Sequence, residues 1–217
     1  MERDFSIKEA IGFGWETVKN NLKFFLLFSL LVIIFSTLPV LAEEFAKKAD
    51  GRNMYMLFKI LYWVFTLLSI FISLGAVKIA LKFVNKEKAE IADLFSQYNV
   101  FINYFIGTIM YSVVVLVGTF LLIIPGIIWS IKFRYFGYLI VEENLKPLAA
   151  FKKSAKITQG VKWQLLGFNF ILVLISLLGF IALLIGSFIT IPLVLLAEVF
   201  VYKKLKEKIS TTNAITI

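Results

Sequence analysis

The sequence predicts an all-α integral membrane protein with six transmembrane helices, arranged as three hairpins that each follow a short amphipathic helix at the cytoplasmic interface. Three observations carry this prediction. The 217-residue chain is 60% hydrophobic and only 17% charged, which is unlike an ordinary soluble domain. Its apolar runs repeatedly reach the roughly 20 residues that a helix needs to cross the hydrocarbon core. Its lysines gather between alternate runs, as in proteins with a cytoplasmic and an outer side.

Hydropathy places six spans in a single integral membrane domain, residues 1–217. The predicted spans are 22–42, 57–80, 102–124, 126–142, 163–185 and 187–202. The third and fourth spans are separated only by Pro125 and Gly126, which we expect to form a hairpin turn, because proline is tolerated in the first turn of a helix. Gly186 is expected to play the same part between the last two spans.

The distribution of lysine and arginine sets the predicted orientation. These residues are dense before the first span, after the second, between the fourth and fifth, and after the sixth. The loop between the first two spans offsets its basic residues with Glu43, Glu44 and Asp50. The positive-inside rule therefore predicts a multi-pass protein with both termini in the cytoplasm. It also accounts for the basic face without any nucleic-acid partner, and predicts contact with anionic lipid headgroups.

Each hairpin follows a segment with the periodicity of an amphipathic helix. The first segment begins with Ser6 and Glu9, a capping-box pair, and the third runs from Pro147 to a stop at Gly160. The apolar positions of the three segments are Ile7, Ile11, Trp15, Val18 and Leu22; Ile91, Leu94, Phe95 and Tyr98; and Leu148, Phe151 and Ala155. We expect these helices to lie in the headgroup layer.

Glycines suggest an internal repeat. Gly107, Gly118 and Gly126 of the second hairpin match Gly167, Gly179 and Gly186 of the third, with the same overall separation. The first hairpin lacks these glycines, so a twofold repeat fits better than a threefold one. Small residues are also frequent in membrane helices, and chance remains an alternative. Small residues at Ser69, Ser73, Ala76 and Ala80 favour close helix packing, either internal or with a second copy or another membrane protein.

The stretch from Leu121 to Gly167 resembles a widespread bacterial family of six-helix inner-membrane proteins, whose relatives include membrane domains fused to some glycerophosphodiester phosphodiesterases. The matching residues are Pro125, Gly126, Ile127, Arg134 and Glu142, followed by an interfacial motif of Ala150, Ser154, Thr158 and Gly160. No phosphodiesterase domain accompanies them in this sequence. The resemblance implies a membrane module in the bacterial cytoplasmic (inner) membrane, and it transfers no catalytic residue.

Three charged residues interrupt the apolar runs. Lys132 and Arg134 lie about 200° apart around a helix, so they cannot share a partner, and we expect Lys132 to extend toward the interface. Glu198 falls at a depth similar to that of Arg134. Three interpretations stay open: an Arg134–Glu198 pair that locks the helices together, a charged cavity for a phosphate or carboxylate, or side chains that reach separately to headgroups.

The composition argues against an enzyme. The sequence has no histidine and no cysteine, which removes the commonest general base and metal ligand and any thiolate nucleophile. Ser154 and Thr158 stand beside Lys153 and Lys156, and a hydroxyl next to a lysine can be a nucleophile. A solvated basic face beside lipid headgroups is the interpretation that we favour. We therefore predict no catalytic residue, metal or cofactor.

Two functions follow as expectations. The first is a non-enzymatic scaffold or accessory protein in envelope or lipid physiology. The second is a small transporter or channel component for an anionic or amphiphilic solute, because interrupted helices and internal repeats accompany transport sites.

Overall fold

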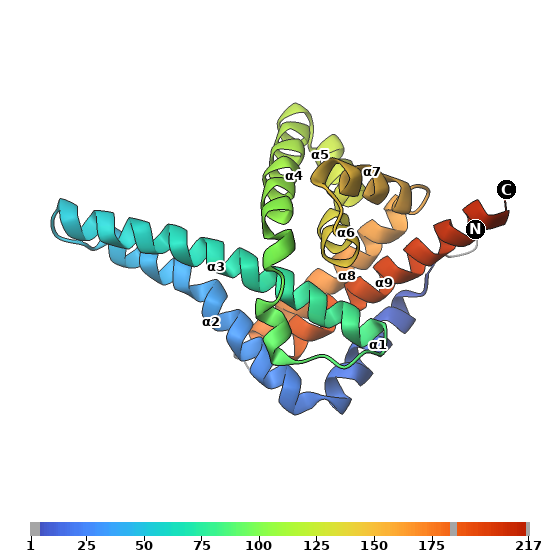
Figure 1. Ribbon diagram of the computed structural model, residues 1–217, viewed down its shortest axis with the longest axis horizontal. Coiled ribbons are helices and arrows are strands. Elements are labelled where there is room, and N and C mark those ends of the chain that lie inside the picture. The colour runs from blue at the N-terminus through green and yellow to red at the C-terminus, as the bar shows by residue number, and fades with distance from the viewer. Residues whose placement is uncertain (1–4, 183–185, 216–217) are drawn as a thin grey trace.

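A computed structural model describes residues 5–182 and 186–215, and its regular structure in those ranges is entirely helical (Figure 1). The fold class is all-α, as predicted. The elements are α1 (Ile7–Asn20), α2 (Leu22–Lys47), α3 (Arg52–Val84), η1 (Ile91–Phe95), η2 (Tyr98–Val100), α4 (Phe101–Leu121), α5 (Ile123–Phe133), α6 (Phe136–Glu143), α7 (Pro147–Ile157), α8 (Lys162–Ile181) and α9 (Ser187–Ile215).

Within the described residues, four helical stretches are long and apolar enough to cross a membrane. They are Leu22–Lys47, Arg52–Val84, Ile91–Leu121 and Lys162–Ile181. These stretches contain the first and second predicted spans and overlap most of the third and fifth, which fits a multi-pass membrane protein. The predicted fourth span, 126–142, is instead divided between α5 and α6, of 11 and 8 residues. Each is too short to cross alone, so six crossings stay a prediction.

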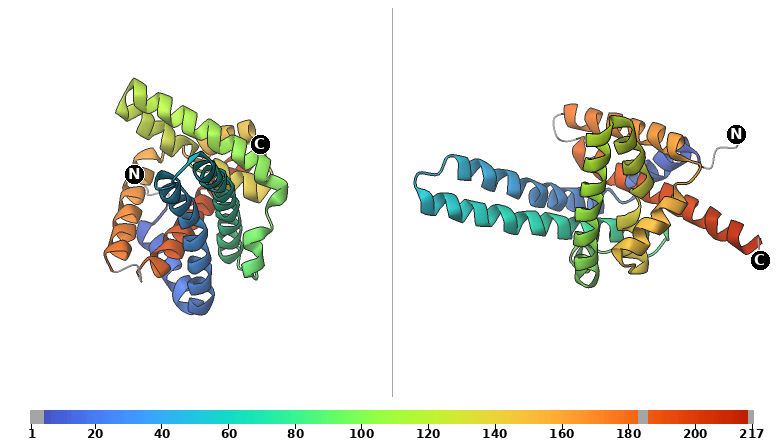
Figure 2. Two further views of the ribbon diagram at one scale, coloured as in Figure 1. Left: turned by 90° about the vertical axis from the view of Figure 1, so that its left-hand side faces the viewer. Right: turned by 90° about the horizontal axis from the view of Figure 1, so that it is seen from above.

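The helix pairs point away from a common centre rather than lying parallel. The α2–α3 pair projects as a long arm, and α4 crosses α3 steeply both in Figure 1 and in the view from above in Figure 2. Helix α9 runs across the centre and ends on the side opposite the α2–α3 arm (Figure 1). Residues 183–185, at the end of the predicted fifth span, lie outside the described residues.

The turn of the second hairpin lies earlier than predicted. Leu122 has an extended backbone (φ −163°, ψ 143°) between α4 and α5, so the chain reverses three residues before Pro125. Pro125 occupies the first turn of α5, where its missing N–H costs no helical hydrogen bond. The prediction that Pro125 and Gly126 form the hairpin turn is therefore wrong. Both residues lie inside α5, which the apolar residues before them have already begun.

Glycines bring the two helices of each later hairpin close together. A Cβ on Gly118 would lie 3.1 Å from the Cα of Gly126, and a Cβ on Gly186 would lie 2.8 Å from the Cα of Gly179. This matching contact accords with the proposed repeat at the hairpin tips. Gly167, by contrast, has nothing within 4 Å, so the correspondence does not extend to the other ends of the helices.

The prediction of a second amphipathic helix is wrong. Its segment forms two short 3₁₀ helices, η1 and η2. Lys82 holds both carboxylate oxygens of Asp93 at 2.6 and 2.8 Å. A Cβ on Gly75 would lie 2.1 Å from the carbonyl oxygen of Leu94. The segment is therefore clamped against α3, and these tertiary contacts outweigh its helical periodicity.

The core of the protein lies where α3, α6 and α9 meet. Every residue from Phe136 to Val141 of α6 is buried, and so is most of 72–81 of α3. Helix α1 begins after Ser6, whose hydroxyl accepts the N–H of Glu9 at 3.2 Å, and it packs closely on α9 through Gly14. The α6 segment is thus apolar because other parts of the protein surround it. Hydropathy alone cannot distinguish a segment buried in protein from one buried in lipid.

Candidate functional site

The candidate site is built around the break between α5 and α6. The helical ladder weakens at Arg134, whose N–H reaches back to the carbonyl of Ile131 at 3.4 Å, and Tyr135 leaves helical geometry (φ −89°, ψ 8°). A broken helix exposes backbone donors and acceptors that need other partners when they are buried.

Two hydroxyls of α7 supply those partners. The Ser154 hydroxyl donates to the carbonyl of Lys132 at 3.0 Å and accepts the N–H of Tyr135 at 3.1 Å. The Thr158 hydroxyl donates to the same Lys132 carbonyl at 3.1 Å. Both side chains are fully buried, as is Ala150. The predicted solvated face for Ser154 and Thr158 is therefore wrong, because these hydroxyls complete the backbone hydrogen bonding of a neighbouring helix.

The end of the interfacial motif lies where the sequence placed it. Gly160 follows α7 with a positive φ of 84°, a conformation that glycine adopts without a Cβ penalty. Its backbone turns the chain toward α8 within a few residues.

Arg134 and Glu198 come together inside the protein. The Arg134 guanidinium donates through Nη2 to Oε1 of Glu198, and the Tyr138 hydroxyl donates to Oε2 at 2.6 Å. The Arg134 and Glu198 side chains are only 14% and 19% exposed. Of the three sequence-based interpretations, the geometry shows the pair, which joins the α5–α6 break to α9.

A small polar cavity adjoins this pair. Its volume is about 270 Å³, and it is lined by Tyr111, Ser130, Ile131, Arg134, Tyr138, Asn169 and Glu198. The buried Nε of Arg134 has no hydrogen-bond partner among the described residues. The Tyr111 hydroxyl donates to the carbonyl of Ser130 at 3.1 Å. The cavity therefore combines a balanced charge pair with one spare hydrogen-bond donor, the Nε of Arg134.

Lys132 takes no part in the charge pair. Its ammonium lies 5.2 Å from the centre of the neighbouring Phe133 ring, and its helical position directs it away from Arg134, as the 200° separation predicted. Among the described residues it makes no ion pair. Its backbone carbonyl, which accepts hydrogen bonds from Ser154 and Thr158, contributes to the site, and its charge does not.

An ionic cluster at the end of α6 was not predicted as a site. Glu142 accepts from Lys203 at 2.7 Å and Lys206 at 2.6 Å, and also from the Tyr202 hydroxyl. Glu143 binds Lys206 and also Lys153 of α7, both at 2.6 Å. The sequence signals were adjacent acids at a helix end and lysines spaced three apart in α9, but neither indicates which helices meet.

Electrostatics in this cluster favour the charged forms. Burial alone would raise the pKa of the Glu143 carboxyl, but hydrogen bonds from Lys153 and Lys206 outweigh it and hold that pKa below its ordinary value. Burial likewise opposes the charge of Lys206, yet its two carboxylate partners raise the pKa of its ammonium. The cluster therefore ties α6, α7 and α9 together through ionised carboxylate and ammonium groups.

A basic cleft lies beside the cluster, between α7 and α9. It has a volume of about 410 Å³ and is lined by Ala149, Lys152, Lys153, Lys156, Ile157, Lys206, Ile209 and Ser210. Lys152 and Lys156 are exposed and make no ion pair within the described residues. We call this surface the α7–α9 cleft.

A scan against protein-family models and searches of curated proteins and of solved structures found no match for the chain. The resemblance to the six-helix inner-membrane family stays a prediction.

Proposed function

We propose that the chain is a non-enzymatic integral membrane protein that binds anionic lipid headgroups and acts as an accessory in envelope or lipid physiology. The observation that carries this proposal is the α7–α9 cleft, where four lysines surround one cavity. A phosphate diester offers the acceptor oxygens that such a group of ammonium donors can bind.

The charge balance of the cleft supports an anionic ligand. Lys153 and Lys206 are already held by Glu143, so they fix the wall of the cleft. Lys152 and Lys156, one helical turn apart on α7, leave two positive charges uncompensated. A basic residue near an anionic leaflet contributes about 1 kcal/mol to membrane attraction. Two spare lysines beside a formed cavity thus favour headgroup binding over a purely solvated face.

Lipid titration by native mass spectrometry tests this proposal. The detergent-purified protein is titrated with phosphatidylglycerol and, separately, with phosphatidylcholine. Lys152→Ala with Lys156→Ala should reduce phosphatidylglycerol binding several-fold and leave phosphatidylcholine unchanged. The matched control is Lys19→Ala with Lys23→Ala, which removes the same charge at the same spacing from another exposed region. Equal losses in both double variants would show nonspecific charge attraction and contradict the proposal.

The proposed location is the bacterial cytoplasmic membrane, with both termini inside. Support comes from the lysine distribution and the four apolar stretches. Because the chain contains no cysteine, single cysteines give an unambiguous labelling experiment. Asp50→Cys should react with an impermeant maleimide in intact cells, whereas Lys88→Cys and Gln159→Cys should react only after permeabilisation. Labelling of Lys88→Cys in intact cells would refute the orientation.

The second candidate function is transport of an anionic or amphiphilic solute. The cavity beside Arg134 favours it, because a partly unsatisfied guanidinium inside a membrane protein can hold an anionic group. Flux of carboxylates and organic phosphates into proteoliposomes tests the idea, with Lys132→Ala as the control beside Arg134→Ala. Flux that is lost only in the Arg134 variant would support transport, and absence of flux in the parent protein would reject it.

A further inference from the structure

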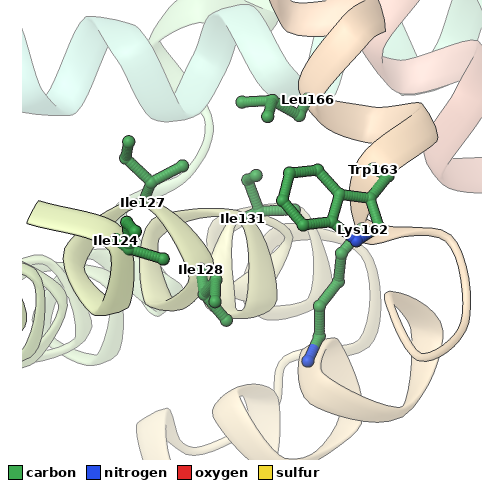
Figure 3. A pocket seen from close by; sticks show the side chains of 7 residues that line it. All are labelled: Ile124, Ile127, Ile128, Ile131, Lys162, Trp163 and Leu166. Carbon is green, nitrogen blue, oxygen red and sulfur yellow. The ribbon is translucent and has the colours of Figure 1, made fainter.

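A third hollow lies between α5 and α8 and differs in character from the polar cavity and from the α7–α9 cleft. Its volume is about 340 Å³, and it is lined by Ile124, Ile127, Ile128, Ile131, Lys162, Trp163 and Leu166. Figure 3 shows the four isoleucines along α5, with the Trp163 ring and Leu166 from α8 facing them across the gap. We call this hollow the α5–α8 groove.

The groove is not closed by helix packing. In the second hairpin, glycines bring α4 and α5 into close contact, with a Cβ on Gly118 only 3.1 Å from Gly126. On its other side α5 presents isoleucines, and Ile124 and Ile127 remain 66% and 42% exposed. Apolar side chains that face a gap between helices in a membrane protein lose nothing if hydrocarbon fills the gap. The occupant must therefore be apolar along most of its length.

The length of the groove suits an acyl chain. Ile124 to Ile131 spans seven residues of helix, or about 10 Å. One leaflet of the hydrocarbon core is about 15 Å thick, so the groove would hold much of one chain of a lipid. The tryptophan at one end fits this picture, because tryptophan is enriched where hydrocarbon meets headgroups.

Among the residues that the structure describes, the only charged side chain that lines the groove is Lys162. Figure 3 shows its side chain leaving the end of the groove near Trp163, with the ammonium away from the isoleucines. Lys162 makes no ion pair with any residue that the structure describes. Ile131 also lines the Arg134 cavity, but there Glu198 balances the charge. A lipid phosphate is therefore expected at Lys162 rather than at Arg134.

From this arrangement we infer that the α5–α8 groove holds one acyl chain of an anionic phospholipid whose phosphate pairs with Lys162. The site is separate from the α7–α9 cleft and goes beyond the proposed function, since it binds the tail as well as the headgroup. It would retain a lipid longer than the surrounding bilayer does.

Photo-crosslinking in nanodiscs tests the inference. Phosphatidylglycerol with a diazirine in one acyl chain is diluted into phosphatidylcholine, and crosslinked peptides are mapped. Crosslinks to 124–131 and 163–166 should exceed those to the exposed face of α4 around Ile109 several-fold. Ile128→Trp, which fills the groove, should reduce them to that background level, whereas the matched control Ile109→Trp should have no effect.

The headgroup is tested by Lys162→Gln, which changes a surface charge and leaves the isoleucines in place. With diazirine-labelled phosphatidylcholine as the comparison probe, the preference for phosphatidylglycerol should fall several-fold in this variant. Even labelling of all lipid-facing segments, or labelling insensitive to both Ile128→Trp and Lys162→Gln, would mean annular lipid only and would overturn the inference. Lys152→Ala with Lys156→Ala should leave the groove crosslinks intact, which separates this site from the cleft.

Discussion

Removing one partner of the Arg134–Glu198 pair should destabilise the protein more than removing both. Arg134→Leu leaves the Glu198 carboxylate inside the protein, but the Tyr138 hydroxyl still donates to it at 2.6 Å. Glu198→Leu is the more severe change, because it leaves both the guanidinium and the Tyr138 hydroxyl without their acceptor. The double variant leaves no stranded charge.

The magnitudes follow from burial. Both side chains are less than one-fifth exposed, and breaking a buried pair costs about 3–5 kcal/mol. We place Arg134→Leu near the lower end of that range and Glu198→Leu near the upper end. The double variant leaves only the Tyr138 hydroxyl without a partner, which should lower the free energy of unfolding by about 1–3 kcal/mol. For a chain of this size, 1 kcal/mol shifts the unfolding temperature by roughly 2–4 °C, so the single variants should lose roughly 6–12 °C and 10–20 °C.

Thermal unfolding in a mild detergent, followed by tryptophan fluorescence, measures these shifts. Tyr138→Phe supplies an internal check, since it should destabilise the parent protein but have little further effect when Glu198 is already leucine. Additive losses in the Arg134 and Glu198 variants would mean that the two residues do not interact. That result would refute the reasoning, and Arg134 would then need another partner.

Three further predictions concern the supports of the site. Ser154→Ala removes both bonds to the α5–α6 break and should cost about 1–3 kcal/mol, whereas Ser176→Ala, which loses only a bond within α8, should be nearly neutral in the same unfolding assay. Gly75→Ala places a methyl group on the backbone of Leu94 and should cost about 1–3 kcal/mol, while Gly167→Ala, which meets open space, should stabilise by about 0.5–1 kcal/mol; similar effects would contradict the clamp. The pKa of Glu143 is lowered from 4.5 in the folded protein, so its contribution is present above pH 4.5 and is lost as the pH falls through the lowered value. Unfolding temperatures between about pH 6 and pH 3 should therefore fall less steeply in Glu143→Gln, and identical slopes would refute this role.

Much of the helical layout could be predicted because local sequence determines it. Apolar length located α2, α3, α4 and α8, and the Ser6 cap located the start of α1. The position of the α5–α6 break could not be predicted, since the glycine of this stretch, Gly137, lies inside α6 and not at the break. The break exists because hydroxyls from α7, some twenty residues later in the chain, offer the backbone other partners. The 3₁₀ turns of η1 and η2 have the same origin, in contacts that periodicity does not record.

For the site, the depth of charged residues within the apolar runs was informative, whereas the lysines beside the α7 hydroxyls were misleading. An Arg134–Glu198 pair was one of three open interpretations, and it could be named because charges inside apolar runs have few possible partners. Tyr138 was missed, because a tyrosine in an apolar run gives no sign that its hydroxyl meets a carboxylate. Ser154 and Thr158 were assigned to a solvated face because of the lysines beside them, but on a helix adjacent residues point in different directions.

Helix α7 connects the features of this protein. Its buried side carries Ser154 and Thr158, which complete the break that positions Arg134. Its Lys153 is tied to Glu143 at the end of α6, and its exposed side lines the α7–α9 cleft. A ligand in the cleft would therefore bind a helix whose opposite face supports the Arg134–Glu198 pair. Ile128 lines the α5–α8 groove but not the Arg134 cavity, so Ile128→Trp should change lipid retention without changing the stability of the charge pair.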